Sequence, residues 1–87
     1  MGIKERFGAA LELPDELMSD TAKLTVTGVR EISIENYKGI IEYTTQEIRI
    51  GCKGYQVNIT GTNLELKVAT GEVVFIEGQI RKIEWIY

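Results

Sequence analysis

The chain has 87 residues, of which 44% are hydrophobic and 26% are charged, and its formal net charge is −3. This length suits one domain with a small core, and the composition is that of a soluble globular protein, which disfavours collagen, a disordered chain and a membrane-spanning protein. With 13 acidic residues against 10 basic ones, the chain lacks the positive surface that nucleic acid requires, so we expect no DNA or RNA partner.

Residues 1–21 are predicted to form a short helix and a clasp ahead of the main domain. Four apolar residues spaced three or four apart predict one stripe of a helix over residues 2–12: Ile3, Phe7, Ala10 and Leu11. Pro14 disfavours helix at the residue before it, so the helix should end there. Phe7 and Leu11 are candidate interaction residues. We expect these two side chains to pack on the sheet, and a partner protein is the next alternative. A membrane surface is the least favoured alternative, because the acidic residues of the segment repel anionic lipid.

No stretch resembles a secretory signal or a membrane span, because charged residues interrupt the first 13 residues and every later apolar segment. We therefore expect a cytoplasmic protein that does not cross a membrane itself. A single free cysteine agrees with a reducing compartment.

From residue 22 onward, apolar residues alternate with polar ones, which is typical of strands with one buried face. The alternation is regular over five segments: residues 23–27, 31–35, 48–50, 55–60 and 64–68. Glycines separate these segments, as short antiparallel strands require. We predict an all-β domain over residues 22–87, a small antiparallel meander of about seven or eight short strands. It would form either a curled roll or two packed sheets.

Four glycines are candidate turn residues: Gly39, Gly61, Gly71 and Gly78. The spacing predicts a type I turn over residues 36–39 that is closed by a left-handed Gly39. It also predicts a three-residue hairpin loop over residues 61–63 and a tight turn over residues 69–72. A stacked solenoid is the lesser alternative, because the glycine spacing is uneven.

Two segments are apolar on both faces, residues 40–41 and 73–76, which predicts central strands that are covered on both sides. In the last segment, Ile80 has the opposite parity from Ile83, Trp85 and Tyr87. We therefore predict a bulge near residues 81–82, which would bring all four side chains to one face.

The last segment is rich in large apolar and aromatic residues. If it forms an edge strand, its free backbone groups and aromatic rings suit a protein partner, although Trp85 in the core is the more frequent arrangement. Five further candidate interaction residues, in addition to Phe7 and Leu11, are Val74, Ile76, Trp85, Ile86 and Tyr87.

Histidine is absent and cysteine occurs once, as Cys52. Histidine is the commonest general base near neutral pH and the commonest metal ligand, and one thiol cannot form an internal disulfide or a cysteine zinc site. We therefore expect no catalytic residue, no metal and no cofactor. Lys53 could activate the thiol, but without a histidine partner a small buried hydrophobe is the favoured interpretation of Cys52.

An alternative hypothesis is a small ligand-binding or catalytic site at the first predicted hairpin. Glu35 and Glu42 lie on consecutive predicted strands, with Tyr43 beside them, and paired carboxylates can act as acid and base. Surface glutamates on hairpins are far commoner. A site would show convergent polar groups in a pocket, whereas an interaction protein would show both glutamates splayed into solvent.

Four stretches carry a resemblance to a known family: residues 13–15, 32–40, 59–64 and 76–80. In this order and spacing, they resemble the YabP/YqfC family of sporulation proteins from endospore-forming bacteria, and YqfC-like members in particular. The resemblance extends from Leu13 to Trp85. No single motif in it is specific, so it rests on order and spacing over the whole length.

The resemblance implies a small non-enzymatic protein that is made in the mother cell during sporulation and is needed for the spore envelope or cortex. The resemblance also implies association with polytopic membrane proteins that act in sporulation, which is similar across members of the family. We therefore expect a scaffold that forms a homo-oligomer or binds such a membrane protein through a sheet edge. The expected location is the cytoplasm, or the periphery of the forespore membrane through the partner. The resemblance carries over no catalytic residue.

Overall fold

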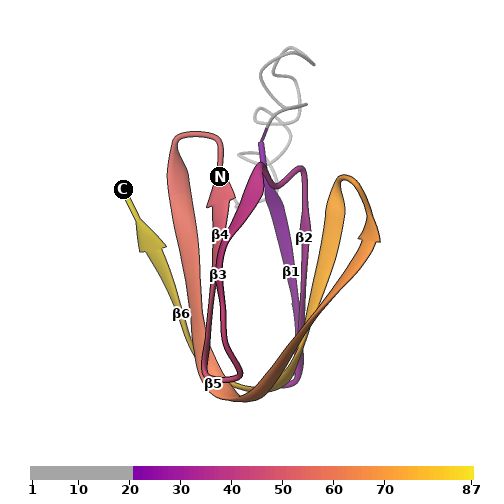
Figure 1. The fold of residues 1–87 in the computed structure, drawn as a ribbon, viewed down its shortest axis with the longest axis vertical. Coiled ribbons are helices and arrows are strands. Elements are labelled where there is room, and N and C mark those ends of the chain that lie inside the picture. Colours follow the sequence, from indigo (N-terminus) through magenta and orange to yellow (C-terminus); the bar gives the residue numbers. More distant parts are fainter. Residues whose placement is uncertain (1–20) are drawn as a thin grey trace, which may run out of the picture.

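The structure, a computed structural model, describes residues 21–87 and contains six strands in one antiparallel sheet (Figure 1). The strands are β1 (Lys23–Thr27), β2 (Glu31–Glu35), β3 (Gly39–Tyr43), β4 (Glu47–Cys52), β5 (Tyr55–Thr70) and β6 (Val73–Ile86). Their order in the sheet is β1-β2-β6-β5-β4-β3. The all-β prediction is confirmed, with fewer and longer strands than expected. The predicted helix, Phe7 and Leu11 lie outside the described residues.

Strands β5 and β6 are long because they continue through two glycines that were predicted to separate strands. The hairpin loop predicted over residues 61–63 is wrong, since these residues lie inside β5. A Cβ atom at Gly61 would collide with the carbonyl oxygen of Gln79, and one at Gly78 would lie 2.6 Å from that of Asn63. The two backbones therefore cross too closely for side chains, and the hairpin bends there instead of ending.

The bend divides the sheet into two halves that face each other (Figure 1). The β2 half consists of β1, β2, residues 73–77 of β6 and residues 65–70 of β5. The β4 half consists of β3, β4, residues 55–60 of β5 and residues 80–86 of β6. One curled sheet thus supplies both layers of the domain, which is the rolled form of the prediction.

Two turns secure the bend by main-chain hydrogen bonds. On one side, the N–H groups of Gly61 and Leu64 donate to carbonyl oxygens in the β3–β4 turn, with N···O distances of 3.0 and 2.7 Å. On the other side, those of Gly78 and Ile80 donate to the β1–β2 turn, at 3.1 and 2.8 Å. Four backbone N–H groups at the bend thereby have acceptors in the neighbouring turns.

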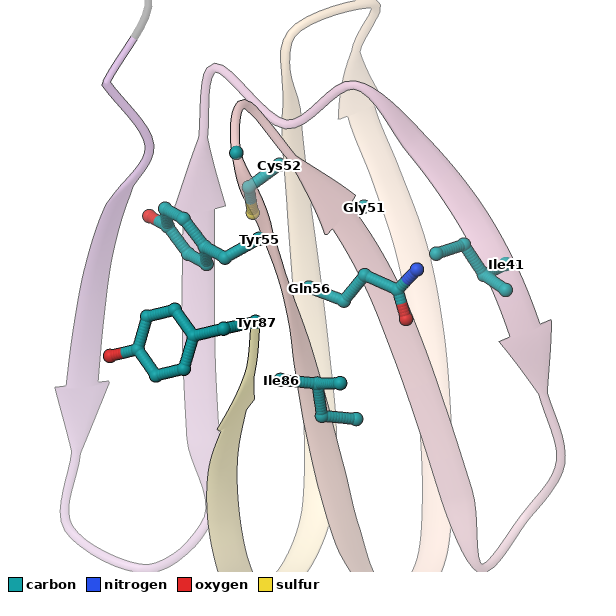
Figure 2. A pocket seen from close by; sticks show the side chains of 8 residues that line it. Ile41, Gly51, Cys52, Tyr55, Gln56, Ile86 and Tyr87 are labelled. Atoms are coloured by element: carbon teal, nitrogen blue, oxygen red, sulfur yellow. The ribbon is translucent and has the colours of Figure 1, made fainter.

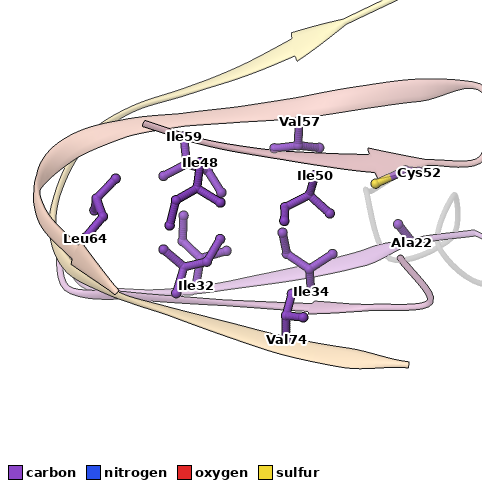
Figure 3. Packing of buried hydrophobic residues seen from close by; sticks show 11 residues of the cluster. Ala22, Ile32, Ile34, Ile48, Ile50, Cys52, Val57, Ile59, Leu64 and Val74 are labelled. Carbon is purple, nitrogen blue, oxygen red and sulfur yellow. The ribbon is translucent and has the colours of Figure 1, made fainter. Parts of the chain in front are cut away.

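The core lies between the halves, where Figure 3 shows the aliphatic side chains of one half meeting those of the other. Eight of them are 0% exposed: Ile32, Ile34, Val74 and Ile76 from the β2 half, and Ile48, Ile50, Val57 and Ile59 from the β4 half. Burial of each such side chain stabilises the fold by about 1.5–3 kcal/mol. Val74 and Ile76, which were candidate interaction residues, therefore lie in the core and contribute no surface.

The connection from β2 to β3 is not the predicted hairpin turn. Its Asn36 N–H donates to Glu72 (2.8 Å), whereas its Lys38 N–H donates to Gly51 (2.7 Å), so the chain crosses here from one half to the other. The left-handed residue is Asn36, with φ 61°, rather than Gly39. Asparagine tolerates this conformation because its short polar side chain can bond locally, and its Nδ2 donates to the carbonyl oxygen of Thr21 (3.2 Å).

The remaining sequence predictions have mixed outcomes. The turn over residues 69–72 is confirmed, as Gly71 and Glu72 link β5 to β6. The bulge near residues 81–82 is confirmed, because the ladder skips Arg81 between Thr60 and Gly61. Residues 73–76 are central, between β2 and β5, but residues 40–41 form an edge strand, contrary to prediction. Among residues 21–87, no helix is long and apolar enough to cross a bilayer.

Candidate functional site

Among residues 21–87, the bent hairpin leaves four strand edges without a neighbouring strand. In the β2 half these are β1 and residues 65–70 of β5, and in the β4 half they are β3 and residues 80–86 of β6. An edge strand offers unpaired N–H and C=O groups to any other strand, so natural proteins usually protect it.

Three of the four edges carry a feature that limits pairing, whereas the bulge of the β6 edge, at Arg81, leaves residues 82–86 as a regular stretch. The Leu66 N–H, on the β5 edge, donates to the hydroxyl of Tyr43 at 3.0 Å. Strand β3 has a bulge at Ile41, which breaks the regular ladder. Strand β1 is short, with 5 residues.

The fourth edge, formed by the last residues of β6, carries large apolar side chains. Trp85 lies opposite Val57 and so shares the inner side of the sheet with the core, yet it is 48% exposed. Ile86 lies opposite Gln56 on the outer side, and Tyr87 beyond it is exposed. The core position expected for Trp85 is wrong, because among the described residues no strand lies next to β6 on this side of the half to cover the side chain. The structure thus brings Trp85, Ile86 and Tyr87 together at one edge.

A shallow hollow of about 320 Å³ lies beside this edge, at the end of the β4 half (Figure 2). It is lined by Ile41, Gly51, Cys52, Gly54, Tyr55, Gln56, Ile86 and Tyr87. Figure 2 shows Tyr55 and Tyr87 pointing to one side of the strands, while Gln56 and Ile86 point to the other. The lining contains no aspartate, glutamate, lysine or arginine side chain, so its side chains offer apolar contact and a few neutral polar groups.

Cys52, which also lines the hollow, is buried, as the sequence predicted for a small hydrophobe. Burial raises the pKa of its thiol above the ordinary 9.0, and a hydrogen bond with Tyr55 lowers it in part. Burial likewise raises the pKa of Tyr55 above 10.0, and Cys52 and Tyr87 add to that rise. Both groups are therefore protonated at neutral pH, and the thiol is a poor nucleophile.

The structure does not build the alternative site at Glu35, Glu42 and Tyr43. Strands β2 and β3 are not neighbours in the sheet, so no hairpin brings Glu35 and Glu42 face to face. Glu35 lies opposite Lys23 of β1, and Glu42 lies exposed opposite Arg49 of β4. The Tyr43 hydroxyl is engaged by the β5 edge.

Two charged residues at the β6 edge, Lys82 and Glu84, are not among the candidate residues named from the sequence. The Nζ atom of Lys82 lies 3.7 Å from Oε1 of Glu84, with side chains 62% and 50% exposed. Both point to the outer side, on either side of Ile83 in the strand. The signal in the sequence is an opposite charge pair two residues apart within a predicted strand, which places both groups on one face.

Another set of polar residues lies on the outer side of the β4 half. Asn58 is 7% exposed and its Nδ2 donates to Oε2 of Glu47 at 2.8 Å, while Arg49 reaches the same oxygen at 3.9 Å. The sequence places Asn58 on the polar side of β5 and so predicts exposure. Glu47 and Arg49 on β4 cover the Asn58 side chain, and the alternation of apolar and polar residues cannot predict this burial.

Comparison with known proteins shows what this chain resembles. The model of the YabP family matches residues 18–86. The "uncharacterized protein YqfC" of Bacillus subtilis (strain 168) is 32% identical over 77 residues, which is 88% of this chain and 83% of that protein. No solved structure matches. The family match covers most of the chain, as does the relative, and on both grounds the protein belongs to the YabP family.

Proposed function

We propose that this protein is a non-enzymatic interaction protein of sporulation, which acts as a scaffold in forming the spore envelope or cortex. It would assemble with itself or bind a polytopic membrane protein of the same programme. The proposal places it in the mother-cell cytoplasm, held at the forespore membrane through its partner. Membership of the YabP family supports this setting, together with the sporulation role that the sequence resemblance implies.

The observation that carries the mode of action is the edge of β6, which has no neighbouring strand among residues 21–87 and on which Trp85 is 48% exposed. A partner strand added to such an edge gains main-chain hydrogen bonds, and an exposed tryptophan supplies a large apolar contact. Ile86 and the adjoining hollow extend the contact to the outer side. This surface supports a protein partner better than a small substrate, because the hollow beside it is lined by apolar and neutral polar groups.

The test is complementation in an endospore-forming bacterium from which the gene for this protein has been deleted. We expect the count of heat-resistant spores to fall in the deletion strain and to recover with the wild-type chain. It should stay low with Trp85→Ser, which removes exposed aromatic surface without altering a fully buried side chain. Immunoblotting checks that each variant accumulates to the wild-type level.

Two control variants show whether the effect is specific to the β6 edge. Val68→Ser changes a side chain that is 55% exposed on the protected β5 edge, and it should restore sporulation. The double variant Glu35→Gln, Glu42→Gln should also restore it, and its failure would favour the ligand-binding or catalytic alternative. Normal sporulation with Trp85→Ser would contradict the mode of action, and normal sporulation of the deletion strain would contradict the setting.

A further inference from the structure

We propose that the occupant of the β6 edge is a second copy of this chain, paired antiparallel through Lys82–Glu84 about a two-fold axis centred on Ile83. This inference rests on the proposed function and specifies its self-assembling form. The β4 halves of the two copies would then form one continuous sheet.

Symmetry restricts the possible registers. In an antiparallel pair, directly opposed residues alternate between hydrogen-bonded and non-hydrogen-bonded positions. A two-fold axis exchanges the two strands, so it must pass between a residue and its own copy. Only a few centres are therefore available in the regular stretch that follows the bulge at Arg81.

Charge complementarity selects one centre among them. Centring on Ile83 places Lys82 of each copy opposite Glu84 of the other, which forms two opposite-charge pairs on the outer side. Centring on Lys82 or on Glu84 would oppose like charges, and centring on Trp85 would leave Glu84 opposite Ile86. Within one copy, the Lys82–Glu84 ion pair is too exposed to contribute much, so both groups are available to a second copy.

The inner side of the same register also fits a second copy. Ile83, which packs partly buried against the core, would lie opposite its own copy. Trp85 would lie diagonal to Ile83 of the second copy, within reach of a large side chain. The contact would cover the inner-side tryptophan that a single copy leaves 48% exposed.

The other edges do not offer the same complementarity. In β1, the five residues Lys23–Thr27 centred on Thr25 would place Lys23 opposite Thr27, with no opposite charge to pair. Strand β3 is interrupted by its bulge, and the β5 edge has a backbone donor already engaged by Tyr43.

The test uses charge exchange at the interface in the full chain. We expect the wild-type protein to be a dimer by sedimentation equilibrium, with Lys82→Glu and Glu84→Lys each weakening dimerisation by about tenfold or more, because each change turns two attractive pairs into repulsive ones. An equimolar mixture of the two variants should recover dimers. Positions 82 and 84 are both acidic in the first variant and both basic in the second, so the two strands would again oppose unlike charges.

Matched controls carry the same charge changes to the competing edges. Lys23→Glu on β1 and Glu42→Lys on β3 should leave the dimer intact, and circular dichroism should show all four variants folded. A monomeric wild-type chain, unaffected dimers of Lys82→Glu and Glu84→Lys, or dissociation by either control would overturn the proposal.

A second readout tests the register itself. Opposed residues have Cβ atoms about 4.5–5.5 Å apart and diagonal ones lie about 7–8 Å apart, and only the former distance approaches that of a disulfide. A mixture of Lys82→Cys and Glu84→Cys should therefore form interchain disulfides under mild oxidation, and neither variant alone should do so. Cross-linking of either variant with itself in preference to the mixture would contradict the register.

The outcomes separate this inference from the proposed function. A wild-type chain that stays monomeric but still needs Trp85 for sporulation would overturn the dimer and leave a different protein as partner. A dimer with the expected charge behaviour, in a protein whose deletion leaves sporulation intact, would support the dimer and contradict the function.

Discussion

Cys52 lies at the end of β4, where its side chain turns towards the core and its backbone begins the turn to β5. The sequence indicated burial by elimination, since a lone cysteine without histidine has few chemical uses. The structure adds the consequence, which is a raised pKa caused mainly by desolvation. Folding therefore favours the neutral thiol, and stability must depend on pH wherever the unfolded chain would ionise.

We predict that Cys52 makes the protein less stable at alkaline pH. Above the ordinary thiol pKa of 9.0, the unfolded chain loses a proton that the folded protein retains, so the free energy of unfolding falls as pH rises through the folded pKa. Below pH 9.0 this contribution to stability is fully present. Cys52→Val should reduce the fall in Tm between neutral and strongly alkaline pH, measured by circular dichroism. The raised pKa of Tyr55 acts in the same direction and leaves a residual slope. Equal slopes in both proteins would contradict the prediction.

Trp85 marks the limit of prediction for a single residue. Alternation correctly assigns it to the same side of the strand as Ile83, and the sequence identified both possible outcomes, core and edge. Which of them holds depends on whether another strand continues the half-sheet beyond β6. That is a property of the topology, and no feature near Trp85 encodes it.

At the scale of elements, the bend in the β5–β6 hairpin organises the fold. Alternation located the strand segments correctly, yet it could not distinguish a glycine that ends a strand from one that lets it bend. The difference at Gly61 and Gly78 lies in the other strand, because each glycine is crossed by a backbone distant from it in sequence. The extra residue at Arg81, by contrast, was predictable because a parity change is local.

We predict that Gly78→Ala destabilises the fold strongly. Gly78 has φ 141°, which L residues rarely adopt, and the added Cβ would lie 2.6 Å from a carbonyl oxygen. Strain and overpacking together should lower the free energy of unfolding by about 2 kcal/mol or more, with a fall in Tm of roughly 10 °C. Gly71→Ala is the matched control, since nothing lies within 4 Å of its Cβ position. Similar Tm values for the two variants would show that the bend tolerates a side chain.

The Tyr43–Leu66 hydrogen bond connects the β3 edge to the β5 edge, and its removal gives another test. Tyr43→Phe should cost about 0.5–1 kcal/mol, because the Leu66 N–H loses its acceptor but can turn to water at this exposed position. Amide hydrogen exchange should speed up at Leu66 and remain unchanged at Ile59 in the core. Unaltered exchange at Leu66 would show that this hydrogen bond does not protect the β5 edge.

For the whole molecule, the sequence predicts the fold class but neither the order of strands nor the choice between a curled roll and two packed sheets. Regular alternation over most of the chain requires one buried face, and both arrangements would bury it. The chain order suggests a meander, and β3 to β6 do form one. Strand β2 instead joins the far side of β6, because Asn36 to Lys38 cross between the halves and bond to each in turn. The surface at the β6 edge depends on that arrangement, and so it could be located only from the structure.

The pairing of β2 with residues 73–77 of β6 also has a consequence for biosynthesis. On the ribosome, the β1–β2 hairpin is translated well before the strand that completes its half of the sheet. The second ladder of β2 stays open until residues 73–77 of β6 have left the exit tunnel, whereas β4 pairs on both sides with strands next to it in sequence. Contacts across such long separations slow folding and lengthen the exposure of apolar surface. Synthesis of this protein therefore has a vulnerable interval between the emergence of β2 and that of β6, during which chaperones can bind the exposed apolar strand edge.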